Sequence, residues 1–203
     1  MSLCIGIYIY DNVEVLDFAG PYEVFTTASR VFQKTFQEHK IPFEVVTIAN
    51  TNRAVKARAG LIIQPDYTLD SHPSLDVLII PGGVVDEALN NETLCQWIQS
   101  IVPKTKLSAS ICTGAFLLAK AGFLDHKKAT THWEDIDDLK RAFPNIHVIQ
   151  HVRWVDEGHI ITSAGISAGI DMSLHLVNRL VDYDLAEKTA RQLEFDWTQT
   201  TIA

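Results

Sequence analysis

The sequence predicts an α/β fold in which helices cover both faces of a mostly parallel central sheet. Two observations predict it. Short, almost wholly apolar runs recur along the chain, and each lies close to a helical pattern rather than to an immediate second strand. Strands of a parallel sheet are buried on both faces, so they read as continuous apolar runs, and each needs a crossover connection before the next strand.

The elements follow this alternation as far as residue 143. Apolar runs predict strands at Leu3–Tyr10, Phe43–Ala49, Leu75–Pro81 and Lys106–Ile111, and amphipathic patterns predict helices at Gly20–Gln37, Asn91–Val102, Thr113–Ala121 and Glu134–Phe143. Pro21 is expected to open the first helix, because the first helical position suits a fixed φ angle and a missing N–H. Arg53–Ala57 and Gly60–Pro65 predict a small hairpin outside the alternation.

The last third of the chain continues the pattern less regularly. Two or three strands are predicted at Ile146–Gln150, Val152–Asp156 and His159–Ser163, followed by helices at Ala168–Val181 and Asp184–Phe195. The complete pattern predicts a flavodoxin-like sandwich, in which ligands bind at the carboxyl ends of the strands. No linker-like stretch divides the chain, so residues 1–203 are expected to form one domain.

Composition excludes several classes of function. The chain carries 17 Lys and Arg against 25 Asp and Glu, a net charge of −8, so nucleic acid is not an expected partner. No run reaches the roughly 18 apolar residues of a membrane span, and the amino terminus lacks the pattern of a signal peptide. Cys4, Cys95 and Cys112 have no CxxC spacing, so neither a disulfide framework nor a metal site is expected. These features predict a soluble, cytoplasmic protein.

Cys112 is the first candidate for chemistry. It lies where the strand Lys106–Ile111 passes directly into the helix Thr113–Ala121, which predicts a tight turn that presents the side chain at the carboxyl edge of the sheet, as in a nucleophile elbow. The start of the helix would also favour a thiolate and lower the pKa of the thiol. The alternative is a small thiol buried in the core.

Gly82, Gly83 and Thr113 are the candidates for binding developing negative charge. Gly82 and Gly83 follow the predicted strand Leu75–Pro81, and without side chains they allow close approach of a substrate. Their backbone N–H groups and that of Thr113 would converge near the sulfur as an oxyanion hole. The alternative is an ordinary turn at the end of a strand.

Asp17 and His132 are the candidates for proton transfer and substrate contact. The apolar neighbours of Asp17, Leu16 and Phe18, predict partial desolvation, which would raise its pKa and let it hold a proton beside a cysteine nucleophile. A cap or turn role is the alternative. His132 would follow a strand back to the same edge, where it either contacts substrate or packs against Trp133.

Five segments taken in order resemble the ThiJ/PfpI superfamily, also called class I glutamine amidotransferase-like. They are residues 16–25 (LDFAGPYEVF), 81–83 (PGG), 110–115 (SICTGA), 130–133 (TTHW) and 162–171 (TSAGISAGID). Within it the chain is most similar to the isonitrile hydratase subgroup, which has Asp in the first loop and Cys-Thr at the elbow. The resemblance implies a flavodoxin-like fold, a homodimer and a cysteine enzyme that needs no cofactor and acts on a small molecule.

The resemblance also implies roles for single residues. Cys112 matches the nucleophile, Asp17 its acidic partner, Thr113 the residue that assists beside the sulfur, and Gly83 a backbone donor to the intermediate. The implied reaction adds water to an isonitrile, R–N≡C, and releases an N-substituted formamide. PfpI-type proteases have His directly after the nucleophile, so Thr113 argues against proteolysis.

Two other functions fit the same residues. The glyoxalase and deglycase branch of the superfamily acts on small 2-oxoaldehydes and usually has Glu in the first loop, where this chain has the shorter Asp17. A non-enzymatic dimer that senses redox state or a small molecule would use reversible oxidation of Cys112.

Overall fold

The computed structural model describes residues 2–36 and 41–198 and contains a seven-stranded sheet with the strand order β10-β11-β7-β6-β1-β2-β5. Its strands are β1 (Leu3–Tyr8), β2 (Phe43–Ala49), β5 (Tyr67–Thr68), β6 (Val77–Ile80), β7 (Leu107–Ile111), β10 (Trp154–Asp156) and β11 (Ile160–Ser163). All neighbours pair in parallel except β10 and β11, which pair antiparallel. The predicted α/β fold with a mostly parallel sheet is therefore confirmed.

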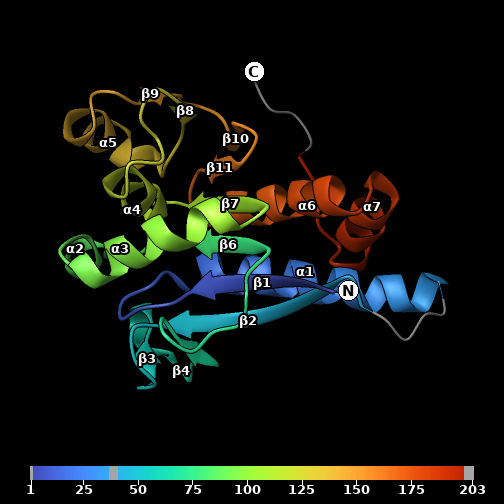
Figure 1. Cartoon of the computed structure of the whole chain (residues 1–203). Coiled ribbons are helices and arrows are strands. Elements are labelled where there is room, and N and C mark those ends of the chain that lie inside the picture. The colour runs from blue at the N-terminus through green and yellow to red at the C-terminus, as the bar shows by residue number, and fades with distance from the viewer. Residues whose placement is uncertain (1, 37–40, 199–203) are drawn as a thin grey trace.

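Helices cover the two faces of this sheet (Figure 1). The helices α1 (Val15–Phe36), α6 (Ala168–Leu180) and α7 (Tyr183–Gln192) contact one another in one layer. The helices α2 (Asp86–Leu89), α3 (Glu92–Ile101) and α4 (Gly114–Lys120) contact one another in the other layer. The central strands lie between these layers, so β6 is buried along its whole length and β7 likewise.

Two smaller sheets and a further helix lie outside the main sheet. The predicted hairpin forms as β3 (Val55–Lys56) and β4 (Ile62–Ile63). The strands β8 (Lys128–Ala129) and β9 (His147–Val148) pair in parallel, and α5 (Ile136–Ala142) packs beside β9. The predicted strand at residues 146–150 is thus shorter and belongs to a separate sheet, while β5 and α2 were not predicted at all.

The start of the first helix corrects one prediction. Helix α1 begins at Val15, six residues before Pro21, so Pro21 lies inside the helix and does not open it. The first turn is held from outside the helix, because the Glu14 N–H donates to the Gly82 carbonyl at 2.9 Å. This long-range contact extends the helix across Asp17, and the predicted end at Gln37 lies outside the described residues.

The carboxyl ends of the central strands gather at one edge. In Figure 1 the arrowheads of β1 and β2 point to the same side, toward α2 and the β3–β4 hairpin. The strands β6 and β7 run parallel to them. The segments that follow β1, β6, β7 and β11 therefore meet at this edge, where the candidate residues lie.

Candidate active site

Cys112 occupies the predicted elbow directly after β7. Its φ angle is 56°, in the left-handed region that non-glycine residues rarely adopt. The surrounding structure holds this conformation: the Cys112 N–H donates to the Ser163 carbonyl at 3.2 Å, and the Cys112 carbonyl accepts from Thr131 Oγ1 at 2.8 Å. A strained backbone at a strand end that is fixed by two neighbouring segments is typical of a functional position.

Two glycines allow the elbow to sit close to its neighbours. A Cβ at Gly82 would lie 2.6 Å from the Thr113 nitrogen and 2.7 Å from the Cys112 Cβ. A Cβ at Gly114 would collide with the Ile80 carbonyl oxygen. The turn after β6 and the start of α4 therefore approach at backbone distance, which brings Gly82 beside Cys112 as the sequence predicts.

Asp17 lies in the first turn of α1 and is fully buried. Both of its carboxyl oxygens accept a backbone hydrogen bond, Oδ2 from the Gly82 N–H at 3.0 Å and Oδ1 from the Ile166 N–H at 3.1 Å. Burial raises the pKa of this carboxyl to about 7, although the two N–H groups and the Cys112 side chain act in the opposite direction. The predicted desolvation of Asp17 is present, and the carboxyl titrates near neutral pH.

Cys112 and Asp17 form a coupled pair. Burial, followed by the negative charge of Asp17, raises the pKa of the Cys112 thiol to about 12, while the Thr113 N–H and hydroxyl lower it. The expectation that the helix start would give a thiol of lowered pKa is therefore wrong. Because a second negative charge is so unfavourable here, the pair keeps one proton above pH 7, and the two pKa values place that proton on the sulfur of Cys112.

Thr113 and Gly83 are bonded to each other. The Gly83 N–H donates to Thr113 Oγ1 at 2.9 Å, and Thr113 Oγ1 donates to the Gly83 carbonyl, also at 2.9 Å. Gly83 has a φ angle of 144°, a conformation that favours glycine. Its N–H is thus occupied by the Thr113 hydroxyl, and its role as a donor to an intermediate stays a prediction that requires this hydroxyl to turn away.

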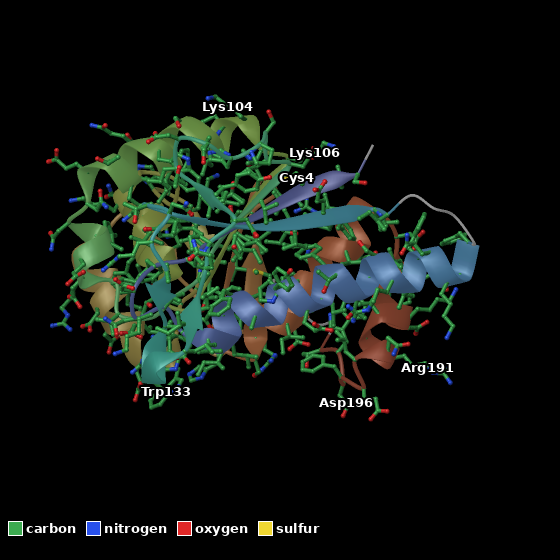
Figure 2. The ribbon with its side chains drawn as sticks, turned by 90° about the horizontal axis from the view of Figure 1, so that it is seen from below. Cys4, Lys104, Lys106, Trp133, Arg191 and Asp196 are labelled. Atoms are coloured by element: carbon green, nitrogen blue, oxygen red, sulfur yellow. The ribbon has the colours of Figure 1, made fainter. Side chains whose placement is uncertain are left out.

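His132 lies beside the loop that reaches Asp17. Its Nδ1 accepts from the Glu134 N–H and is 3.4 Å from the Asp135 carboxylate, and its ring lies 5.7 Å from that of Trp133. Gly165 packs so closely on this ring that a Cβ would collide with His132 Cδ2. The imidazole is mostly buried, whereas Trp133 is 75% exposed and points outward at the edge of the molecule (Figure 2).

Three residues affect the site although no sequence pattern predicted that they would lie near it. The buried Tyr10 hydroxyl donates to the Pro81 carbonyl at 3.3 Å, and burial and nearby charges, Asp17 and Cys112 among them, raise its pKa well above the ordinary value. Asp135 lies near enough to Cys112 to raise the pKa of the thiol. Ile166 contributes only a backbone N–H, so its side-chain type predicts nothing about this contact.

The remaining sequence expectations concern metals, thiols and membranes. Among residues 2–36 and 41–198, no group of three or more His, Cys, Asp or Glu side chains is arranged to hold a metal ion. Cys4, Cys95 and Cys112 are free thiols. Within the same described ranges, none of the helices combines the length and the apolar character that crossing a bilayer requires.

Comparison with known proteins adds sequence and structural relatives. Isonitrile hydratase of Pseudomonas putida is 34% identical over 196 residues, which cover 96% of this chain and 79% of that protein. The HTH-type transcriptional regulator GbdR of Pseudomonas aeruginosa is 29% identical over 86% of this chain but only 46% of its own length, so this chain spans about half of that regulator. The crystal structure of a ThiJ/PfpI family protein from Pseudomonas syringae superposes with a TM-score of 0.84 at 28% identity, covering 100% of this chain and 79% of the other.

A family model covers most of the same region. The DJ-1/PfpI family model matches residues 4–179, which include the elbow cysteine, the buried aspartate and both glycines of the turn after β6. This range, together with the similarity over nearly the whole chain to isonitrile hydratase, shows that the protein belongs to the DJ-1/PfpI family.

Proposed function

We propose that the protein is a cysteine-dependent hydratase that adds water to an isonitrile and releases an N-substituted formamide. One observation carries the proposal. The fully buried Asp17 carboxyl, with a pKa near 7 and both oxygens oriented by backbone N–H groups, is coupled to Cys112. Hydration of an isonitrile needs one group that both gives and takes a proton beside the nucleophile, and a pKa near the working pH suits both tasks.

The surroundings of the sulfur favour a slender electrophile. Cys112 is only 8% exposed. The terminal carbon of R–N≡C ends a linear group, so it reaches a nearly buried sulfur more easily than a branched carbonyl does. The similarity to the isonitrile hydratase of Pseudomonas putida supports the same reaction class.

In the first step the thiol passes its proton to Asp17 as the sulfur attacks the terminal carbon of the isonitrile. The new bond joins sulfur to carbon, one π pair moves onto nitrogen, and the lone pair of the carbon accepts the proton from Asp17. The product is a thioimidate, R–N=CH–S, on Cys112, and Asp17 is left as a carboxylate. The high thiol pKa opposes a free thiolate, so proton transfer to Asp17 accompanies the attack, in which the new S–C bond removes the negative charge from the sulfur.

In the second step the Asp17 carboxylate takes a proton from water while the water oxygen bonds to the thioimidate carbon. The C=N π pair moves onto nitrogen, which accepts that proton. The C–S bond then breaks, the hydroxyl proton returns through Asp17 to the sulfur, and the formamide R–NH–CHO leaves. The Thr113 N–H, which lowers the pKa of Cys112, stabilises negative charge on the sulfur in both steps.

The direct test incubates the protein with a simple alkyl isonitrile and follows the formamide by NMR. Cys112→Ala removes the nucleophile and is expected to abolish turnover, while Cys95→Ala, which changes a thiol on α3, is the matched control and keeps it. Asp17→Asn is expected to reduce kcat by about 10²- to 10⁴-fold through loss of proton transfer. Absence of formamide, or turnover that survives Cys112→Ala, would refute the proposal.

The same protein samples separate the other functions. If the protein converts methylglyoxal to lactate but does not hydrate the isonitrile, glyoxalase activity replaces isonitrile hydration as the proposed function. Selective oxidation of Cys112 by peroxide without any turnover would favour a sensor. We also propose that the chain forms a homodimer, which sedimentation equilibrium tests directly, because a monomer gives half the expected mass.

A further inference from the structure

The loop between β11 and α6, residues 164–167, touches two of the candidate residues at once. The Ile166 N–H donates to Asp17 Oδ1 at 3.1 Å, and Gly165 packs against the His132 ring. Ile166 has a φ angle of 53°, an unfavourable conformation for a β-branched side chain. A strained loop keeps such a conformation only when other contacts hold it, so the contacts of the neighbouring residues decide where the Ile166 N–H points.

Arg153 binds this loop at its beginning and at its end. The Arg153 carbonyl accepts from the Ala164 N–H at 2.8 Å, and Arg153 Nη2 donates to Ser167 Oγ at 3.2 Å. Arg153 Nε also donates to the Asp171 carboxylate in the first turn of α6. One side chain thus connects the loop to the helix that follows it, just outside the catalytic residues.

Asp171 is the buried end of this arrangement and also binds the carboxyl-terminal segment. Its side chain is fully buried, and its Oδ1 accepts from the Thr198 N–H at 2.7 Å. Its backbone carbonyl accepts from Trp197 Nε1 at 3.2 Å. An ion pair between this buried carboxylate and the partly exposed Arg153 contributes little net stability, so fixing one geometry is the better account of its presence.

We propose that Arg153 is a positioning residue that, through Ser167 and Asp171, holds the loop at residues 164–167 so that the Ile166 N–H stays on Asp17. The inference rests on the proposed function only in treating Asp17 as the proton carrier. The carboxyl-terminal segment also holds Asp171 in place, because the Thr198 N–H donates to the carboxylate oxygen that Arg153 does not bind, and Trp197 Nε1 donates to the backbone carbonyl of Asp171.

The proposal predicts a change in how Asp17 titrates. Glu14 from the start of its own helix and Cys112 from the elbow face this carboxyl, and Tyr10 from the end of β1 interacts with it electrostatically. None of these contacts passes through Arg153. Of the contacts to Asp17 that the loop at residues 164–167 makes, the Ile166 N–H is the one that depends on Arg153. This N–H stabilises the charged form of Asp17, so its loss is expected to raise the pKa of that carboxyl.

The test measures the rate of alkylation of Cys112 by iodoacetamide between pH 5 and pH 9, followed on the Cys112 peptide by mass spectrometry. The rate is expected to rise as the Asp17–Cys112 pair loses its first proton, with Asp17→Asn removing that transition. In Arg153→Gln the midpoint is expected to move up by about one pH unit. Arg153→Lys keeps the positive charge beside Asp171 but lacks the guanidinium group that binds Ser167 and Asp171 together. Its midpoint is therefore expected to lie between those of the unmodified protein and Arg153→Gln.

Arg179→Gln is the matched control. Arg179 lies near the other end of α6, where it binds Asp156 and the Gly158 carbonyl, away from the loop. Its loss is expected to leave the midpoint unchanged. If Arg153→Gln does not fold, Ser167→Ala removes only the Nη2 contact and is expected to move the midpoint in the same direction by a smaller amount.

An unchanged midpoint in folded Arg153→Gln, or an equal shift in Arg179→Gln, would overturn the proposal. Alkylation does not depend on isonitrile chemistry. A protein that shows the shift but hydrates no isonitrile therefore keeps the positioning role and loses the proposed reaction.

Discussion

Replacing Asp17 by Asn is expected to stabilise the protein at alkaline pH while removing its chemistry. Burial raises the pKa of Asp17 from 3.8 to about 7 in the folded protein. An acid whose pKa is raised on folding stabilises the folded state only while it is protonated. That stability is fully present below about pH 4 and is lost as the pH rises to about 7. Asn does not ionise and avoids this loss.

The size of the effect follows from the shift and from the hydrogen bonds. A rise of about three pKa units corresponds to about 4 kcal/mol, and the fully buried side chain leaves little solvent screening. Against this, Asn has one acceptor oxygen for the two N–H groups of Gly82 and Ile166, which costs about 1–3 kcal/mol at every pH. The variant is therefore expected to be less stable at pH 4 and about 1–3 kcal/mol more stable at pH 8.

Urea unfolding at pH 4, 6 and 8, followed by the fluorescence of the four tryptophans, measures the difference. Asp156→Asn is the control with the opposite sign, because the His175 side chain and other donors lower the pKa of Asp156 and its ionised form stabilises the fold. A stability difference for Asp17→Asn that stays constant from pH 4 to pH 8 would refute the assigned pKa and with it the proposed role of Asp17.

Three further changes probe the elbow. Thr113→Val removes the hydroxyl that binds both polar groups of Gly83, so thermal unfolding is expected to show a loss of about 1–3 kcal/mol; an unchanged Tm would contradict the contact. Cys112→Gly is expected to be about 1 kcal/mol more stable than Cys112→Ala, because glycine adopts the left-handed conformation freely; equal urea midpoints would exclude strain there. Gly114→Ala places a methyl group against the Ile80 carbonyl oxygen and is expected to cost about 3 kcal/mol or more, and near-native stability in the same assay would contradict the close packing.

Local patterns in the sequence were sufficient for most of the fold. The strand at Phe43–Ala49 has the predicted bounds, and the helix predicted at Ala168–Val181 forms as Ala168–Leu180. Continuous apolar runs and helical periodicity arise from each segment's own side chains, so they can be read without knowing the neighbours. The two-residue strand β5 could not be predicted, because so short a segment has no pattern and becomes a strand only by pairing with β2.

Pro21 shows where a local signal was misleading. Its fixed φ angle suits the start of a helix, yet α1 begins six residues earlier, where the Glu14 N–H bonds to Gly82 from a distant strand end. A residue that favours the start of a helix reports only the backbone preference of its own segment, not the contacts that this segment makes with distant ones. The contact with Gly82 arises from the packing of β1 against β6, which no local pattern contains.

The reactive groups of the site can be identified without the fold: a thiol at a strand-to-helix junction, an aspartate between apolar neighbours, and a threonine where a histidine would indicate proteolysis. The protonation of these groups, in contrast, depends on how the chain folds. Burial raises the pKa values of both Cys112 and Asp17, and the second N–H on Asp17 comes from Ile166, 149 residues away in the chain. The pKa of a buried group depends on how far water is excluded and on which dipoles face it, and both are set by segments that meet only in the folded protein.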